Sequence, residues 1–184
     1  MKISKAEGLT VSFRFVREDD AEFILNLRLD PELGLYLSPT DPSVEKQREW
    51  LAEYKRREEA GEEYFYIITN NKNGKRCGTA RLIIKEEHFE FGSFILNSDK
   101  TPTASIETAL FIYHTGFDNL NFEKAHFNAN KENIRVVKFH EKMGVRIIGE
   151  VETGVGIEHL YEMDLRDWAK LREKFKAFIV KDLN

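Results

Sequence analysis

The sequence has a single cysteine, no long apolar run and no strong excess of charge of either sign. Cys77 is the only cysteine among 184 residues, so no disulfide can form within the chain, and a reducing compartment is its simplest environment. No segment approaches the roughly eighteen consecutive apolar residues that a membrane-spanning helix needs. The first residues, MKISKAEGLT, lack the apolar core of a signal peptide, so we expect a cytoplasmic protein with no membrane partner.

The balance of charge bears on the kind of partner. The 28 Lys and Arg residues and 32 Asp and Glu residues give a net charge of −4, which argues against a general nucleic-acid binder. Hydrophobic residues make up 41% of the chain and charged residues 33%, as in soluble globular proteins. Since no repeat, linker or low-complexity segment interrupts it, we expect one domain over residues 1–184.

The spacing of apolar residues predicts the order of the elements. Strands are expected over Leu9–Val16, Tyr64–Thr69, Cys77–Lys85, His88–Leu96, Lys124–Ala129, Val145–Val151 and Ile157–Asp164. Helices are expected from Asp19 or Asp20 to Pro31, from Asp41-Pro42 to about Ala60, and over Ala104–Leu120, Glu132–Met143 and Asp167–Leu183. This order predicts a mixed α+β fold, a mostly antiparallel twisted sheet of about seven strands with helices on both faces.

Two finer expectations concern the second helix and its surroundings. Trp50, Leu51 and Tyr54 are expected to form its buried side, with Asp41 as its N-cap. The segment Leu33–Pro42 before it is expected to be a loop on the substrate side.

The stretch from Phe89 to Val145 is the most informative part of the chain. It reads strand, polar loop, apolar helix, short strand, Asn-containing turn, second helix and glycine, so a helix begins directly after a strand. Free backbone N–H groups and the helix dipole make such a helix start a phosphate site. Within it, ENIRVVKFHEKMGV resembles the signature N-x-x-[A/S]-x-x-[L/F]-Y-E-K-x-G-F of the GNAT superfamily of acyl-CoA-dependent N-acetyltransferases. The match falls on Asn133, Glu141, Lys142 and Gly144.

The resemblance covers roughly Phe13 to Asp164 and implies a GNAT-like fold in which the fourth and fifth strands splay apart. It implies acetyl-CoA as the co-substrate and no metal. The coenzyme-binding residues that it implies are Ile95, Leu96, Thr101, Thr103, Ala104, Ser105, Ile106, Asn133 and Val136.

The phosphate loop departs from the family pattern. The pattern [Q/R]-x-x-G-x-[A/G] aligns with TPTASI, so Thr101 replaces Gln or Arg, Ala104 replaces Gly and Ile106 replaces the small residue. If the position required a left-handed conformation, alanine there would cost about 1–2 kcal/mol. The hydroxyls of Thr101, Thr103 and Ser105 offer donors in compensation. Without a ligand, the same residues would form an ordinary Ser/Thr-rich helix cap.

Two helix residues have a functional and a plain interpretation. The resemblance gives Asn133 a bond to the pantetheine amide of the coenzyme, whereas Asn is also a favoured helix cap. His140 replaces the signature Tyr that protonates the departing thiolate. An imidazole with an ordinary pKa near 6.5 could supply that proton at neutral pH, whereas a lone histidine in a helix more often only packs.

The base that deprotonates the amine should come from the splayed strand. Its alternation places His88, Glu90 and Phe94 on one face and Phe89, Phe91 and Ile95 on the other. Glu90 is therefore the leading base, acting directly or through water, with His88 as the alternative. The plain interpretation is a solvated carboxylate at a sheet edge.

The function expected from these features is transfer of an acetyl group from acetyl-CoA to a primary amine of a small molecule. A nucleotide-linked amino sugar is the first expectation, resting only on the resemblance of the loop TPTASIETAL to acyltransferases of surface-polysaccharide pathways. LRLDPEL at Leu27–Leu33 resembles a segment of acetyltransferases that act on protein N-terminal amines and on nucleotide-linked amino sugars. A protein N-terminal amine is the second. A binding module is the rival, since the Gly and the Tyr are missing. A homodimer is left open because the sequence does not fix the oligomeric state.

Overall fold

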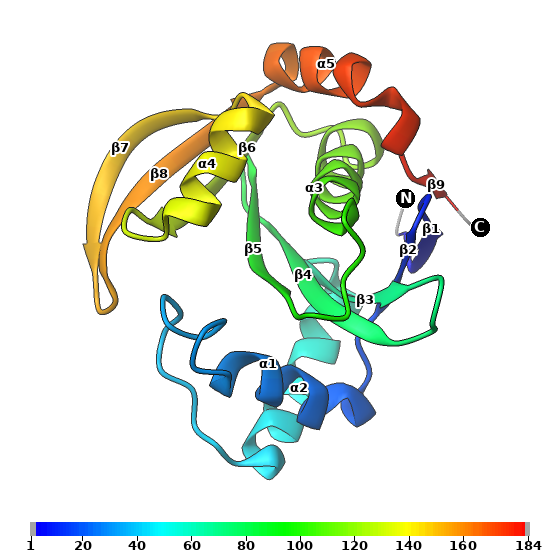
Figure 1. Ribbon diagram of the computed structural model, residues 1–184, viewed down its shortest axis with the longest axis vertical. Helices are drawn as coiled ribbons and strands as arrows, with labels where there is room; N and C mark the ends of the chain where they lie inside the picture. The colour runs from blue at the N-terminus through cyan, green and yellow to red at the C-terminus, as the bar shows by residue number, and fades with distance from the viewer. Residues whose placement is uncertain (1–2, 183–184) are drawn as a thin grey trace.

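The computed structural model describes residues 3–182, and its side chains as far as residue 180. Nine strands in this part form one sheet in the order β7-β8-β6-β5-β4-β3-β2-β1-β9 (Figure 1). The strands are β1 (Lys5–Glu7), β2 (Val11–Phe15), β3 (Glu63–Asn70), β4 (Arg76–Ile84), β5 (Phe89–Leu96), β6 (Lys124–Asn130), β7 (Arg146–Thr153), β8 (Gly156–Asp164) and β9 (Lys181–Asp182). The mixed, mostly antiparallel fold is confirmed, with β1 and β9 added to the expected strands.

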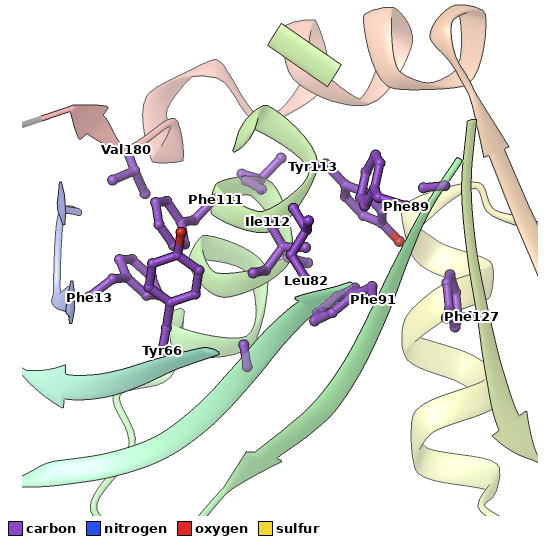
Figure 2. Packing of buried hydrophobic residues seen from close by; sticks show 14 of the residues in the cluster. Phe13, Tyr66, Leu82, Phe89, Phe91, Phe111, Ile112, Tyr113, Phe127 and Val180 are labelled. Carbon is purple, nitrogen blue, oxygen red and sulfur yellow. The ribbon is translucent and has the colours of Figure 1, made fainter. Parts of the chain in front are cut away.

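The helices are α1 (Ala21–Leu29), α2 (Val44–Ala60), α3 (Ala104–His114), α4 (Ile134–Met143) and α5 (Leu165–Lys174). Figure 1 shows α1 and α2 on one side of the sheet and α3 and α5 on the other. A small apolar cluster lies under α1 and α2 and includes Leu51, Tyr54 and Phe65. A larger one lies under α3, where Phe13, Phe111 and their neighbours pack (Figure 2).

Local capping explains where several helices begin and end. α2 begins after Ser43, whose hydroxyl accepts a hydrogen bond from the backbone N–H of Lys46, so the prediction of Asp41 as N-cap is wrong. Asp41 instead accepts a bond from the N–H of Ser43 at 3.0 Å. α4 ends at Gly144, whose φ of 75° is the left-handed conformation expected there.

Two further expectations, on α2 and α3, need correction. Trp50 is 37% exposed, because its ring stacks on Tyr54 at the outer edge of α2 instead of entering the core. The helix predicted to reach Leu120 is α-helical to His114 and continues as a short π-helix over Thr115–Asn119.

The C-terminal helix is shorter than the predicted Asp167–Leu183. It begins at Leu165, where the carboxylate of Asp164 caps the N–H groups of the first turn, and ends at Lys174. A 3₁₀ turn over Lys176–Phe178 follows it. Leu183 lies outside the described residues.

No helix among residues 3–182 is both long and apolar enough to cross a bilayer.

Candidate active site

Strands β5 and β6 separate from each other after a short parallel contact. They pair at Phe89 with Ala125 and at Glu90 with His126, and no pairing is recorded beyond these positions. All other neighbouring strands of the sheet pair antiparallel. The splay predicted for the fourth and fifth expected strands therefore falls between β5 and β6.

A β-bulge at Ser93 redirects the side chains at the end of β5. The register with β4 shifts between the pair Arg81–Gly92 and the pair Thr79–Ile95, so two residues of β5 oppose Ala80 alone. Ser93 adopts a φ of 47°, and its carbonyl accepts a hydrogen bond from the Thr79 hydroxyl at 2.8 Å.

The bulge overturns the predicted faces of this strand. Phe94 packs beside Phe91, with ring centroids 5.2 Å apart, and not on the face of Glu90. Ile95 pairs with Thr79 and so shares the face of Gly92. A period of two residues cannot anticipate this exchange, because the extra residue inverts the alternation.

The splay opens into a cleft of about 610 Å³, a size typical of small-molecule sites. One wall is the loop after α1, from Glu32 to Leu37, whose Tyr36 hydroxyl donates to the Glu132 carbonyl at 3.3 Å. The residues of β5 and β6 beyond their parallel contact line it, and α4 forms the opposite wall. The cleft thus runs from the side of α1 to the side of α3 and α4.

The hydroxyls predicted for the phosphate loop turn mostly inward. Thr101 and Thr103 contact the hydroxyl of Thr10 at 2.6 and 2.9 Å, and Thr103 also donates to Glu107 at 2.7 Å. Glu107 is fully buried and accepts a further bond from the N–H of Thr10 at 2.9 Å. These two hydroxyls therefore anchor β2 to α3 and are not free donors. Ser105 lines the cleft.

The backbone at the start of α3 remains suited to an anion. Ala104 is the first residue of the helix and has no positive φ, so the predicted strain of alanine at this position is absent. The first i→i−4 hydrogen bond of the helix runs from the backbone N–H of Glu107 to the carbonyl of Thr103. The N–H groups of Ser105 and Ile106, which come before it, therefore have no acceptor in the helix.

Two cations that the sequence reasoning missed lie near this helix start. Burial and the charge of Arg135 both lower the pKa of Lys100, which places the two groups close together. Arg135 lines the cleft, with Lys138 and Lys142 further along α4. Positive charge thus gathers on the α4 side. The missed signal was the clustering of basic residues in α4.

Asn133 is the N-cap of α4, and its side-chain oxygen accepts a bond from the N–H of Val136 at 3.3 Å. Both residues also line the cleft. The capping interpretation is confirmed. Contact with the coenzyme stays a prediction.

His140 lies in the cleft wall but in an apolar environment. It is 4% exposed, and its ring centroid lies 4.1 Å from that of Phe127 and 5.3 Å from that of Tyr161. Burial lowers its pKa to about 3, which argues against the protonated imidazole that was expected to supply a proton at neutral pH. Its Nδ1 is buried without a hydrogen-bond partner, which favours the tautomer that carries hydrogen on Nε2.

Glu90 lies near the closed end of the splay and does not line the cleft. Its carboxylate is 3.6 Å from Lys85 and 3.9 Å from His88, and burial lowers the pKa of His88. Of the two base routes, only the one through water fits this position. Two other carboxylates, those of Glu32 and Glu158, line the cleft and were missed.

Gly92 leaves its part of the cleft open. A Cβ atom placed on it would have no neighbour within 4 Å. Asn128 of β6 also lines the cleft. No cluster of three or more metal-ligating side chains occurs among the described residues.

Comparison with known proteins agrees with this geometry. A family model described as an acetyltransferase (GNAT) domain matches residues 10–146. Apo FdhC, described as a nucleotide-linked sugar GNAT, superposes with a TM-score of 0.85 at 36% identity, covering 95% of this chain and 98% of that one. No curated protein sequence matches the chain.

Two more distant structures are alike in fold alone. The ribosomal-protein-S5-alanine acetyltransferase from Vibrio fischeri has a TM-score of 0.71 at 15% identity, covering 89% of this chain and 98% of that one. The spermidine N-acetyltransferase from Vibrio cholerae, in complex with CoA and spermine, has a TM-score of 0.72 at 19% identity, covering 87% and 98%.

Proposed function

The chain belongs to the GNAT family and is an acetyl-CoA-dependent acetyltransferase that acts on an amine; on this premise, we propose that its acceptor is a nucleotide-linked amino sugar. The observation that carries the proposal is the 36% identity to a nucleotide-linked sugar GNAT across nearly the whole of both chains. The acceptor side of the cleft is open at Gly92, which is compatible with a bulky sugar ring.

The α3 and α4 side of the cleft fits the coenzyme. The free N–H groups of Ser105 and Ile106 and the cations of Lys100 and Arg135 suit the phosphates. Ile95 and Leu96 lie on the part of β5 that has no partner strand on the β6 side, so backbone groups there are available to an extended ligand. When bound, acetyl-CoA supplies the acetyl thioester.

The acceptor amine must lose a proton before it attacks, because an ammonium has no free electron pair. Glu158 and Glu32 line the cleft and give the acceptor side a negative charge that attracts an ammonium. We assign the deprotonation to Glu158 in direct contact, with Glu90 acting through water as the alternative.

His140 has a different part from the one predicted for it. A neutral imidazole with hydrogen on Nε2 can donate a hydrogen bond to a sulfur in the cleft but cannot act as an acid at neutral pH. The departing thiolate would then take its proton from water.

The proposal is tested with a panel of acceptors. The purified protein is incubated with acetyl-CoA and, separately, with nucleotide-linked amino sugars, spermidine and a peptide with an N-terminal alanine. Release of free thiol and the mass of the product are followed. We expect an amino sugar attached to a nucleotide to have the highest kcat/KM. Preference for the peptide or for spermidine would overturn the assignment of the acceptor.

A further inference from the structure

Arg28 and Arg81 interact electrostatically and lie next to residues that line the cleft, although neither lines the cleft itself. Arg81 belongs to β4, and the register places it directly opposite Gly92, on the sheet face that α1 and α2 cover. Arg28 lies in the last turn of α1. At the other end of that helix, Asp20 accepts a hydrogen bond from Arg76 in the first position of β4, at 2.9 Å. The helix therefore follows β4 and brings Arg28 toward Arg81.

The carboxylates around these arginines do not balance their charge. Arg28 donates to the Thr40 hydroxyl at 2.7 Å and to the Ser38 carbonyl at 3.2 Å, both neutral, and within residues 3–182 no carboxylate is recorded as its partner. Arg81 is 3.5 Å from Glu63, which Arg57 already binds at 2.6 Å.

The environment of both groups favours an additional anion. The Nε atom of Arg81 is buried without a hydrogen-bond partner. Burial and the charge of Arg81 lower the pKa of Arg28. Burial, with the charge of Arg57, lowers the pKa of Arg81 against the opposing influence of Glu63 and, more weakly, Glu90. Since guanidinium groups stay charged, these shifts reflect unfavourable desolvation and repulsion, which a bound anion would relieve.

We propose that Arg28 and Arg81 bind the diphosphate of a nucleotide-linked amino sugar and so select acceptors that carry a nucleotide. The inference rests on the proposed function and adds the residues that recognise the substrate class. Adjacent strands lie about 4.8 Å apart, and one sugar ring separates the reacting amine from the diphosphate. With the amine over Gly92, the diphosphate therefore comes within reach of Arg81 on the next strand.

The loop after α1 holds the second arginine at the same place. Ser38 and Thr40, which bind Arg28, follow directly after Leu37, which lines the cleft. Guanidinium groups suit this ligand because their forked donors match two phosphate oxygens at once.

The test compares Arg28→Gln and Arg81→Gln with Arg48→Gln, which removes the same charge from an exposed position of α2. Binding of uridine diphosphate and thymidine diphosphate is measured by calorimetry, and KM is measured for a nucleotide-linked amino sugar and for the same sugar without its nucleotide. We expect Arg28→Gln and Arg81→Gln each to weaken diphosphate binding and raise the KM of the linked sugar about 10- to 100-fold. In these two variants the KM of the sugar without its nucleotide should not change. The control Arg48→Gln should keep the thermal stability of the wild type.

Arg81→Lys is a second variant that should fold normally, because it keeps a cation beside Glu63 and loses only the forked donors of the guanidinium. Its KM for the linked sugar should still rise several-fold. If the wild type acetylates the linked sugar and both Gln variants match Arg48→Gln, the inference is wrong while the proposed function stands. If the wild type acetylates no nucleotide-linked amino sugar, the proposed function is wrong and the inference fails with it.

Discussion

Replacing His140 with phenylalanine should make the stability of the protein less sensitive to acid. The imidazole is 4% exposed, has a buried Nδ1 without a partner, and packs against the rings of Phe127 and Tyr161. Burial lowers its pKa from an ordinary 6.5 to about 3. Between these values the unfolded chain binds a proton that the folded chain does not. The free energy of unfolding therefore falls as the pH drops from about 6.5 toward 3.

The size of the effect follows from the same two pKa values. At pH 7.5 both states are almost entirely unprotonated at His140, so the group contributes almost nothing. At pH 5 the unfolded histidine is largely protonated, and the folded state is disfavoured by roughly 2 kcal/mol. For a chain of this size that is a difference of about 4–8 °C in Tm.

The assay is a pair of thermal unfolding curves at pH 7.5 and pH 5 for each protein. Carboxylates also titrate in this range, but they do so in wild type and variant alike, so the difference between the two Tm shifts isolates His140. Phenylalanine keeps the ring and removes both the titration and the unpaired nitrogen. Val137→Ala, at a buried position of the same helix, is the matched control because it weakens packing without removing a titratable group. It should lower Tm by a similar amount at both pH values. An equal acid shift in wild type and His140→Phe would refute the reasoning.

Three further substitutions test the site. Gly92→Val should fold normally, because an added side chain meets open space. It should lower kcat/KM for the acceptor at least tenfold and leave the coenzyme affinity unchanged. A matching loss of coenzyme affinity would contradict the placement of the acceptor. Ala104→Gly should lower the free energy of unfolding by about 1 kcal/mol, because the position is helical, and should not tighten acetyl-CoA binding; calorimetry that showed tighter binding would restore the strain argument. Glu158→Gln should reduce kcat most at low pH, where the amine is hardest to deprotonate. If the pH–rate profile of Glu158→Gln matches that of the wild type and the profile of Glu90→Gln differs from it, Glu90 is the base.

Local patterns were sufficient for most of the fold. The spacing of apolar residues found the strands and helices on both sides of the splay, and the motif around Asn133 and Gly144 located the end of α4 at Met143 and its start to within two residues. These features depend on residues near one another in the chain. The expected sheet lacked β1 and β9, which pair only with each other and with β2.

The candidate site depended more on contacts between distant segments. Thr101 and Thr103 were expected to face a ligand, but Thr10, more than ninety residues earlier in the chain, holds both. The ordinary pKa assumed for His140 ignored a burial that arises from β6 and β8. Neither environment can be read from the neighbouring sequence, because tertiary packing creates it.

The prediction of the side-chain faces of β5 failed for a different reason, the bulge at Ser93. Non-glycine residues such as Ser93 rarely adopt a positive φ, so Ser93 itself gave no signal of the shift. The missed signal was Gly92 directly before it, because an isolated glycine inside a strand often marks a bulge. A single extra residue in β5 was enough to exchange the faces of Phe94 and Ile95. The same register, once observed, places Gly92 beside Arg81.

The most direct test of the account is a crystal structure of the protein with CoA and a nucleotide-linked amino sugar bound together. We predict that the CoA diphosphate contacts the N–H groups of Ser105 and Ile106 and that the sugar amine lies over Gly92, on the α1 side of the splay. The diphosphate of the sugar nucleotide should lie against Arg28 and Arg81. Electron density for either ligand outside the cleft between β5 and β6, or for both on the same side of it, would contradict the central claim.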